Sequence, residues 1–296
     1  MAAKKKDSKG IVLIATGHVY YGRYAYQLAT SIRFTDPEIG ITLLTDGTAT
    51  GQLNNLQRSI FDEVKVIDNK YLTRKGQPSY IKPKVYLNEL TPYDRTIYLD
   101  VDMIHPPKRQ FAELFDMLEG TEWAVQNWGA IDLAKTTEGR HIPWIDTEDI
   151  VSAYKLKEGK LYNYCSEFIY FEKTANTKKY FSAVQKVYET PGVRFLDFSG
   201  TVPDELAFSI ASAKLKFYPK FDNWRPIYWE HKEKQRIDGA DLNNSYWGYS
   251  LGGAITSNWS KKVYNNLLNF YVNKTGLTMP LQARDKRSFL TNRAVI

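Results

Sequence analysis

The chain has 296 residues, of which 43% are hydrophobic and 25% charged, and this composition is typical of a globular protein with one large domain or two smaller ones. The 40 Lys and Arg against 33 Asp and Glu give a net charge of +7, which favours anionic ligands. The apolar run near the N-terminus, 11–15, is far shorter than the roughly 20 residues of a membrane span. No apolar signal region follows the lysines at 4–6, so we expect a cytoplasmic protein without a transmembrane segment. The single cysteine, Cys165, excludes an intrachain disulfide.

Apolar periodicity predicts strands that alternate with helices over the first third of the chain. The expected strands are 11–16, 41–45, 63–67 and 95–99, and helices are expected after the turn at Gly17, at 52–60 and at 84–90. Such alternation predicts a mainly parallel sheet with right-handed crossovers. Ligands of such sheets bind beyond the carboxyl ends of the strands, so the turns after Thr16, Thr45 and Leu99 are expected along one crevice.

The rest of the chain is less regular. We expect helices at 109–118, 176–189, 203–213 and 261–271, strands at 123–126, 166–171 and 215–218, and a polar, irregular insertion at 130–159. The fold class predicted is therefore α/β, with a mixed, mainly parallel central sheet flanked by helices and an elaborated C-terminal part.

Two carboxylates, Asp100 and Asp102, directly follow the strand predicted at 95–99. Side chains two residues apart in an extended chain point to the same side, so both can face one cation. Hard oxygen ligands suit Mg²⁺ or Mn²⁺ shared with phosphate oxygens. The alternative is a solvated acidic turn, which is common at strand ends.

The turn after the first strand runs from Gly17 to Gly22 and has the glycine spacing of a Walker A loop. It lacks the terminal Lys-Ser/Thr pair, and no G-x-G-x-x-G fingerprint follows the strand either. What remains is a turn whose backbone amides can face a ligand at a helix N-terminus. Alternatively, Gly17 only permits a tight turn.

Four segments together resemble GT-A fold (Rossmann-like) glycosyltransferases, especially the glycogenin-like retaining group called family 8. They are 92–102, with Tyr-Leu before the D-x-D motif; the 111–115 helix; Ser-Glu-Phe-Ile-Tyr-Phe at 166–171; and Pro-Asp-Glu at 203–205. Their order and intervals match the family, and the resemblance covers about residues 11 to 225.

The resemblance implies where a nucleoside-diphosphate sugar would bind. Asp100 and Asp102, with Val101 between them, would hold Mn²⁺ or Mg²⁺ together with the diphosphate of this donor. The nucleoside would be held by the first two turns and the start of the first helix, at Ala15, Thr16, Gly17, Tyr21, Thr45 and Asp46.

The resemblance also assigns contacts with the sugar. Lys82 and Lys84 fall where a basic residue often meets phosphate or sugar, although solvated lysines have the same appearance in a sequence. Asp204 and Glu205 correspond to a P-D-Q-D segment that holds sugar hydroxyls near the anomeric carbon, with Glu205 where the family usually has Gln; an Asp here can also be a helix cap. Glu167 falls where the family often has an Asn-Ser/Ala-Gly run, and it can instead be a strand-edge carboxylate. We expect Asp204, Glu205 and Glu167 to be catalytic.

The family usually supplies a third metal ligand from a histidine in a G-x-x-K-P-W context. None of the four histidines, His18, His105, His141 and His231, has that context. His231 is the best positional candidate for a ligand beside Asp100 and Asp102, and a merely hydrogen-bonded or solvated histidine is the alternative.

We therefore expect a metal-dependent glycosyltransferase that moves a hexose or pentose from a nucleoside diphosphate onto an acceptor hydroxyl, with retention implied by the resemblance. The acceptor is a glycan or lipid precursor or, because the chain is basic, a modified DNA base. A nucleotidyltransferase would need a Gly-rich signature with a basic residue after the first strand, which this chain lacks. Intact Asp100 and Asp102 argue against a non-catalytic sugar-binding module.

The expected domain organisation follows from these assignments. Residues 1–10 form a basic, disordered N-terminus, 11–275 a single catalytic domain, and 276–296 a basic tail. Within the domain, 11–128 is the expected nucleotide-sugar-binding half and 129–275 the acceptor half.

Overall fold

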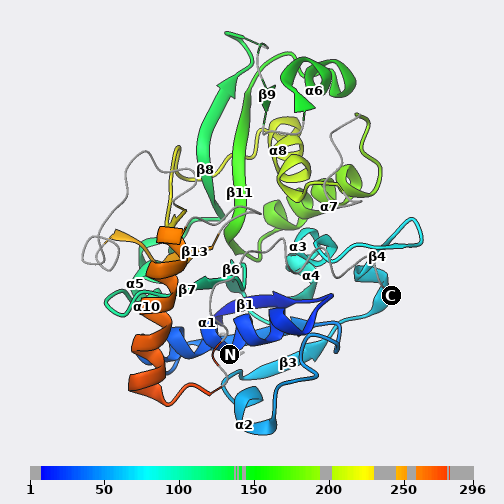
Figure 1. Ribbon diagram of the computed structural model, residues 1–296. Coiled ribbons are helices and arrows are strands. Elements are labelled where there is room, and N and C mark those ends of the chain that lie inside the picture. Colours follow the sequence, from blue (N-terminus) through cyan, green and yellow to red (C-terminus); the bar gives the residue numbers. More distant parts are fainter. Residues whose placement is uncertain are drawn as a thin grey trace, which may run out of the picture. The chain divides into compact units, whose positions relative to one another are not determined.

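The computed structural model describes residues 8–136, 138, 140–141, 145–193, 202–229, 245–251, 258–278 and 280 (Figure 1). A mostly parallel six-stranded sheet has the order β3-β2-β1-β6-β11-β8. Its strands are β1 (Lys9–Ala15), β2 (Gly40–Thr45), β3 (Glu63–Val66), β6 (Arg95–Leu99), β8 (Trp123–Asp132) and β11 (Lys160–Glu172). β2 and β3 pair in parallel, whereas β11 is antiparallel to both β6 and β8. The predicted mixed α/β class is confirmed.

The chain divides into two compact units. Unit 1 comprises Met1–Val12, Ile67–Leu99 and Leu118–Arg225, and unit 2 comprises Leu13–Val66, Asp100–Met117 and Pro226–Ile296.

Unit 2 is built around the long helix α1 and the C-terminal helix α10, which lie side by side (Figure 1). Gln27 of α1 donates from Nε2 to the hydroxyl of Tyr264 on α10 at 2.9 Å, and both side chains are buried. His18 caps α1, because its Nδ1 accepts from the Tyr20 N–H at 3.2 Å. The elements of unit 2 outside the large sheet are α1 (Val19–Thr35), α2 (Asn55–Arg58), β7 (Met103–Ile104), α5 (Phe111–Met117), β12 (Ile227–Tyr228), β13 (Gly248–Ser250) and α10 (Asn258–Thr275).

Unit 1 has an aromatic core beneath the long strands β8 and β11, where α7 and α8 lie beside β11 (Figure 1). Trp123 is 2% exposed, stacks on Phe208 of α8 and meets Tyr180 of α7 edge-on, at centroid distances of 5.7 and 4.8 Å. Burial of these large rings stabilises the unit. Its remaining elements are a 3₁₀ turn (Asn69–Tyr71), β4 (Thr73–Arg74), β5 (Gln77–Pro78), α3 (Lys82–Val85), α4 (Leu87–Leu90), β9 (Arg140–His141), β10 (Ile145–Asp146), α6 (Thr147–Tyr154), α7 (Ala175–Glu189) and α8 (Asp204–Leu215).

Several predicted elements differ from the structure. The strand expected at 215–218 is wrong: α8 continues to Leu215, and Lys216 ends it in the left-handed conformation, with the Phe217 N–H bonded to the Ser212 carbonyl at 3.1 Å. The helix expected at 84–90 is two short helices that meet at Tyr86. The helix expected at 52–60 covers only Asn55–Arg58, between its Asn54 cap and Ser59.

The segment 130–159 is more regular than expected. β8 continues to Asp132, because β11 pairs with it as far as Lys160, and α6 occupies Thr147–Tyr154. None of the helices in the described ranges is long and apolar enough to cross a membrane.

Candidate functional site

The site residues of unit 1 lie where β11 departs from regular pairing. Cys165 is opposite Gln126 of β8, but the next paired residue, Ile169, is opposite Val125, so 166–168 form an irregularity in the ladder. The pairing of β11 with β6 ends at Phe168 and Leu99. Such bulges redirect side chains and are frequent beside functional sites.

Ser166 joins α3, β11 and α8 through a directed hydrogen-bond chain. The Lys84 ammonium donates to Ser166 Oγ at 3.3 Å, and Ser166 Oγ donates to Glu205 Oε1 at 3.2 Å. Lys84 Nζ also lies 3.5 Å from Asp204 Oδ2, and these two side chains are 11% and 3% exposed. Lysine cannot accept, so the direction of the hydrogen bond from Lys84 to Ser166 is fixed. We call Lys84, Ser166, Asp204 and Glu205 the Lys84 cluster.

Asp204 and Glu205 form the first turn of α8, where the helix dipole favours negative charge. Pro203 is the N-cap, and no side chain makes the capping hydrogen bond, so Asp204 is not the cap that the sequence also allowed. Its carboxylate faces Lys84 instead.

The environment raises the pKa of Glu205 to about 8. Burial is the largest cause and the charge of Asp204 the second, while the charge of Lys84 acts in the opposite direction. Titratable groups perturbed in this way are concentrated at functional sites, which makes the Lys84 cluster a candidate on physical grounds.

Glu167 and Cys165 adjoin this cluster. Burial raises the pKa of the Cys165 thiol well above its usual range, with further contributions from the charges of Glu167 and Glu205. Both carboxylates are thus near the same thiol. Of the three residues predicted to be catalytic, Asp204 and Glu205 belong to the Lys84 cluster, and Glu167 lies beside it.

The partners of Lys82 differ from those of Lys84. Its ammonium lies 2.6 Å from Glu189 Oε1 and donates to the Thr73 carbonyl at 2.7 Å. Tyr86 donates its hydroxyl to the same Glu189 oxygen at 3.0 Å. Lys82 therefore anchors the end of α7, and the structure does not bring it to Asp204 or Glu205.

In unit 2, the turns after β1 and β2 are joined by a carboxylate. Asp46 Oδ2 accepts from the Gly17 N–H at 2.7 Å, and its Oδ1 accepts from the Ala49 N–H at 3.1 Å. Gly17 has a φ of 83°, so it takes the left-handed conformation that a tight turn requires. Thr16, directly after β1, and Thr45, the last residue of β2, are buried, at 5% and 0% exposure. The structure therefore joins the two turns through Gly17 and Asp46, with Thr16 and Thr45 as their sequence neighbours, and the assignment of these residues to a nucleoside stays a prediction.

At Gly22, helix α1 lies very close to the loop that follows β2. A Cβ at this position would be 1.9 Å from the Ala49 carbonyl oxygen. Only glycine permits this approach, which fixes the helix against the loop that Asp46 organises. Tyr21, half-buried, precedes Gly22 in the first turn of α1.

Asp100 and Asp102 occupy the segment between β6 and β7. Asp102 is 8% exposed, and its backbone carbonyl accepts from the Leu251 N–H at 3.0 Å. The charge of Asp102, together with that of Tyr24, adds to burial in raising the pKa of Tyr264 far above its usual range. Tyr264 of α10 is therefore a neighbour of the D-x-D segment.

The carboxylates of Asp100 and Asp102 have the hard oxygen ligands that suit a divalent cation shared with phosphate oxygens. Within the described ranges, no group of three or more His, Cys, Asp and Glu side chains could hold a metal ion. Two carboxylates with phosphate oxygens are a usual environment of Mg²⁺. His231, the predicted third ligand, lies outside the described residues.

His105 is a core residue. It is fully buried, its Nδ1 lies 2.6 Å from the Trp247 carbonyl and its Nε2 lies 2.8 Å from the Arg109 carbonyl. Burial lowers its pKa.

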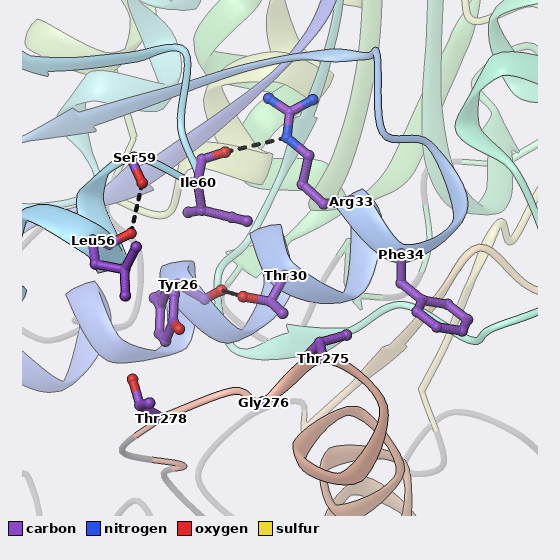
Figure 2. A pocket seen from close by; sticks show the side chains of 10 residues that line it. All are labelled: Tyr26, Thr30, Arg33, Phe34, Leu56, Ser59, Ile60, Thr275, Gly276 and Thr278. Atoms are coloured by element: carbon purple, nitrogen blue, oxygen red, sulfur yellow. Dashed lines mark hydrogen bonds between the residues drawn. The ribbon is translucent and has the colours of Figure 1, made fainter.

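A surface cavity of about 370 Å³ lies elsewhere in unit 2, between α1, α2 and the end of α10 (Figure 2). Arg33 Nε donates across it to the Ile60 carbonyl at 3.2 Å, and Leu56 is 78% exposed at its edge. None of the predicted site residues lines this cavity.

Sequence reasoning did not select Ser166, Cys165 or Tyr264. Ser166 directly precedes Glu167, a predicted site residue, and lies in the sequence between the predicted carboxylates at 100–102 and at 204–205. These positions were the only signal for it. Nothing in the local sequence connects Tyr264 with Asp102, because 162 positions separate them.

These features define a GT-A fold, and solved structures of glycosyltransferases share it. The galactosyltransferase LgtC, solved with donor and acceptor sugar analogues, is 14% identical, with a TM-score of 0.52 over 94% of this chain and 99% of that one. The bifunctional glycosyltransferase WbbM is 12% identical, with a TM-score of 0.56 over 92% of this chain. The match covers 51% of WbbM, so the chain spans about half the length of that protein. No protein-family model and no curated protein sequence matches the chain.

Proposed function

We propose that the protein is a glycosyltransferase that takes a sugar from a nucleoside diphosphate, with a divalent cation as cofactor. The observation that carries the proposal is the Asp100 and Asp102 pair directly after β6 of a GT-A sheet. The fold alone does not specify a reaction, and therefore the chemistry has to come from these residues.

The two carboxylates and the ordered turns supply the functions that donor binding needs. Mg²⁺ or Mn²⁺ held by Asp100 and Asp102 would stabilise the charge that develops on the departing diphosphate. Gly17 and Asp46 hold the two turns assigned to the nucleoside in one arrangement through their 2.7 Å hydrogen bond. A preformed turn lowers the entropy lost on binding.

The Lys84 cluster is assigned to the sugar. It offers hydrogen-bonding carboxyl groups on the rigid first turn of α8, held by Lys84 and Ser166. Sugar hydroxyls are recognised by such fixed donors and acceptors. Retention of anomeric configuration is proposed from the resemblance to the glycogenin-like group.

For the acceptor, we propose a glycan or lipid-linked saccharide, since LgtC was solved with an acceptor sugar analogue. The net charge of +7 favours a DNA base as the second candidate. Association with DNA would weaken steeply with salt, whereas binding of a small neutral saccharide would change little between 50 and about 200 mM salt.

The test is incubation with a panel of nucleoside-diphosphate sugars and Mn²⁺ or Mg²⁺, with hydrolysis of each donor measured by released nucleotide. We expect slow hydrolysis of one donor that stops on chelation. Asp102→Asn should reduce this rate by about 100-fold or more, because one charged ligand is lost, while the circular dichroism spectrum stays unchanged.

The matched control is Asp149→Asn, the same chemical change at an exposed position of α6, which should leave the rate unaltered. Absence of binding and turnover for every donor with either ion would refute the proposed function. Full activity of Asp102→Asn would show that the cation site is elsewhere.

A further inference from the structure

The buried amide of Asn127 in β8 holds the loop at 221–225 in one conformation. Asn127 is fully buried. Its Nδ2 donates to the carbonyl oxygens of Val125 at 3.0 Å and Phe221 at 2.9 Å. Its Oδ1 accepts from the N–H groups of Gly129 at 3.1 Å and Asn223 at 2.7 Å. A side-chain amide offers two hydrogens and two lone pairs, so these four bonds leave no group of Asn127 for a ligand.

The backbone of the 221–225 loop is also bonded along the outer edge of β8, the last strand of the sheet. The Asn127 N–H donates to the Trp224 carbonyl at 3.0 Å, and the Lys220 N–H donates to the Trp123 carbonyl at 3.0 Å. Asn223 has a φ of 52°, a left-handed conformation that is uncommon for residues other than glycine. Such residues persist where the surrounding contacts determine them, and they are concentrated at ligand-binding and active sites.

The loop places a half-buried tryptophan, Trp224, beside the irregular part of β11. The Trp224 ring meets Phe168 edge-on, with the ring centroids 5.2 Å apart, and it also contacts Phe221 of the loop. Phe168 is the last residue of the 166–168 irregularity, which begins with Ser166 of the Lys84 cluster. Trp224 is therefore a partly exposed neighbour of the strand segment that carries Ser166.

Trp128 and Arg225 continue this surface. Arg225 Cζ lies 5.2 Å from the centroid of the Trp128 ring, and both side chains are half-buried. Asp222 and Asn223 of the loop are exposed. Aromatic faces bordered by hydrogen-bonding groups suit saccharides. An exposed carboxylate can accept from sugar hydroxyls, whereas the phosphates of DNA offer it no donor, so these residues favour a saccharide as ligand.

We propose that Asn127 is a positioning residue for the acceptor, because it fixes the 221–225 loop so that Trp224 and the Trp128–Arg225 pair form a wall for a saccharide. The use of this wall by an acceptor rests on the proposed function. An acceptor hydroxyl has to reach the sugar assigned to the Lys84 cluster, and the wall adjoins that cluster through Phe168. Asn127 acts through the loop without touching the acceptor. A wall that is already ordered lowers the entropy lost on binding.

The first experiment separates acceptor binding from donor hydrolysis. Nucleotide release from the donor that the protein hydrolyses fastest is measured with increasing maltose, cellobiose or lactose, which gives a KM for the saccharide. Asn127→Asp keeps the Oδ1 acceptor but turns a carboxylate oxygen toward the Val125 and Phe221 carbonyls, which removes both Nδ2 bonds. We expect the KM for the saccharide to rise by about tenfold or more, while hydrolysis without saccharide stays within about twofold.

The matched control is Asn176→Asp, the same chemical change at an exposed position of α7, where Nδ2 donates to Glu122 Oε2 at 3.0 Å. This variant should alter neither the KM nor the hydrolysis rate. A purely structural role of Asn127 would lower the hydrolysis rate and the thermal midpoint together, without a selective change in the KM for the saccharide. That result, or an unchanged KM in a folded Asn127→Asp protein, would overturn the proposal.

If Asn127→Asp does not fold, Asn127→Ser replaces it, because serine removes the same bonds without burying a charge. Trp224→Leu tests the wall itself: leucine keeps an apolar contact with Phe168 but lacks the flat ring, so the KM for the saccharide should again rise about tenfold. Nucleotide release that is stimulated by DNA and by none of the saccharides would overturn the proposal.

If the protein hydrolyses no donor, the proposed function fails, and the wall is tested without it. Saturation-transfer NMR with the same saccharides should then show binding to the original protein and to Asn176→Asp, with the signal lost in Asn127→Ser and in Trp224→Leu. Equal signals in all four proteins, or no signal in any of them, would overturn the proposal.

Discussion

Gly22→Ala is the change whose effect the structure defines most sharply. Gly22 is the fourth residue of α1, and within a helix alanine is normally favoured over glycine by about 1 kcal/mol. Here, however, the new Cβ would be 1.9 Å from the Ala49 carbonyl oxygen and 2.7 Å from the Ala49 carbonyl carbon. Both are backbone atoms, so no side-chain rotation can relieve the overlap, and α1 or the 46–50 loop has to move.

The cost exceeds the gain in helix propensity. Overpacking of a well-ordered contact typically costs about 1–3 kcal/mol, and a backbone clash of this severity belongs at or above the upper end. After subtraction of about 1 kcal/mol for helix propensity, we expect a net loss of about 2 kcal/mol or more. For a chain of 296 residues this corresponds to a thermal unfolding midpoint lowered by roughly 3 °C or more.

The assay is thermal and urea unfolding followed by circular dichroism, with Gly51→Ala as the control. A Cβ at Gly51 would be 3.3 Å from the Thr48 carbonyl oxygen, a tight contact that a small shift relieves, so its effect should stay within about 0.5 kcal/mol. The Gly22 change should also weaken nucleotide binding, because the displaced loop carries Asp46. An equal or higher unfolding midpoint for Gly22→Ala than for Gly51→Ala would refute the reasoning.

Two further predictions concern stability. Lys82→Met removes the 2.6 Å ion pair with Glu189 and the hydrogen bond to the Thr73 carbonyl. Because Glu189 is a third exposed, we expect the free energy of unfolding in urea to fall by about 2 kcal/mol. A decrease below about 0.5 kcal/mol would contradict the anchoring role of Lys82. His105 has a lowered pKa in the folded protein, so the unfolded chain binds the extra proton first as pH falls through its ordinary value near 6.5. The free energy of unfolding should therefore decrease below pH 6.5 by up to about 1.4 kcal/mol per pH unit. His105→Gln should lack this contribution to the pH dependence. If the free energy of unfolding changes equally with pH in both proteins, His105 does not titrate differently on folding.

The sequence predicted the elements whose signals are local. The apolar runs of β1, β2 and β6 and the helical spacing in α1 are properties of short windows, and the structure has each element close to the expected bounds. The D-x-D segment was found for the same reason, since its position depends only on the end of β6.

The Lys84 cluster could be predicted only in part. Lys84 and Ser166 are 82 residues apart and Ser166 and Glu205 are 39 apart, so their hydrogen bonds depend on the packing of α3, β11 and α8. The irregular pairing of β11 at 166–168 leaves no mark in the apolar pattern, because the strand is buried on both sides of it. Proximity in the sequence does not imply a shared site either: Lys82 is only two residues from Lys84, but it pairs with Glu189.

The single thiol of the chain offers a way to observe motion in unit 1 without any mutation. Cys165 is 5% exposed, and its raised pKa keeps it in the unreactive thiol form at neutral pH. An alkylating reagent can therefore modify it only when β11 opens transiently, so the labelling rate measures how often the strand that carries Ser166 exposes itself. A donor that binds the Lys84 cluster should slow this labelling, and the protein thereby contains its own probe of substrate-linked opening.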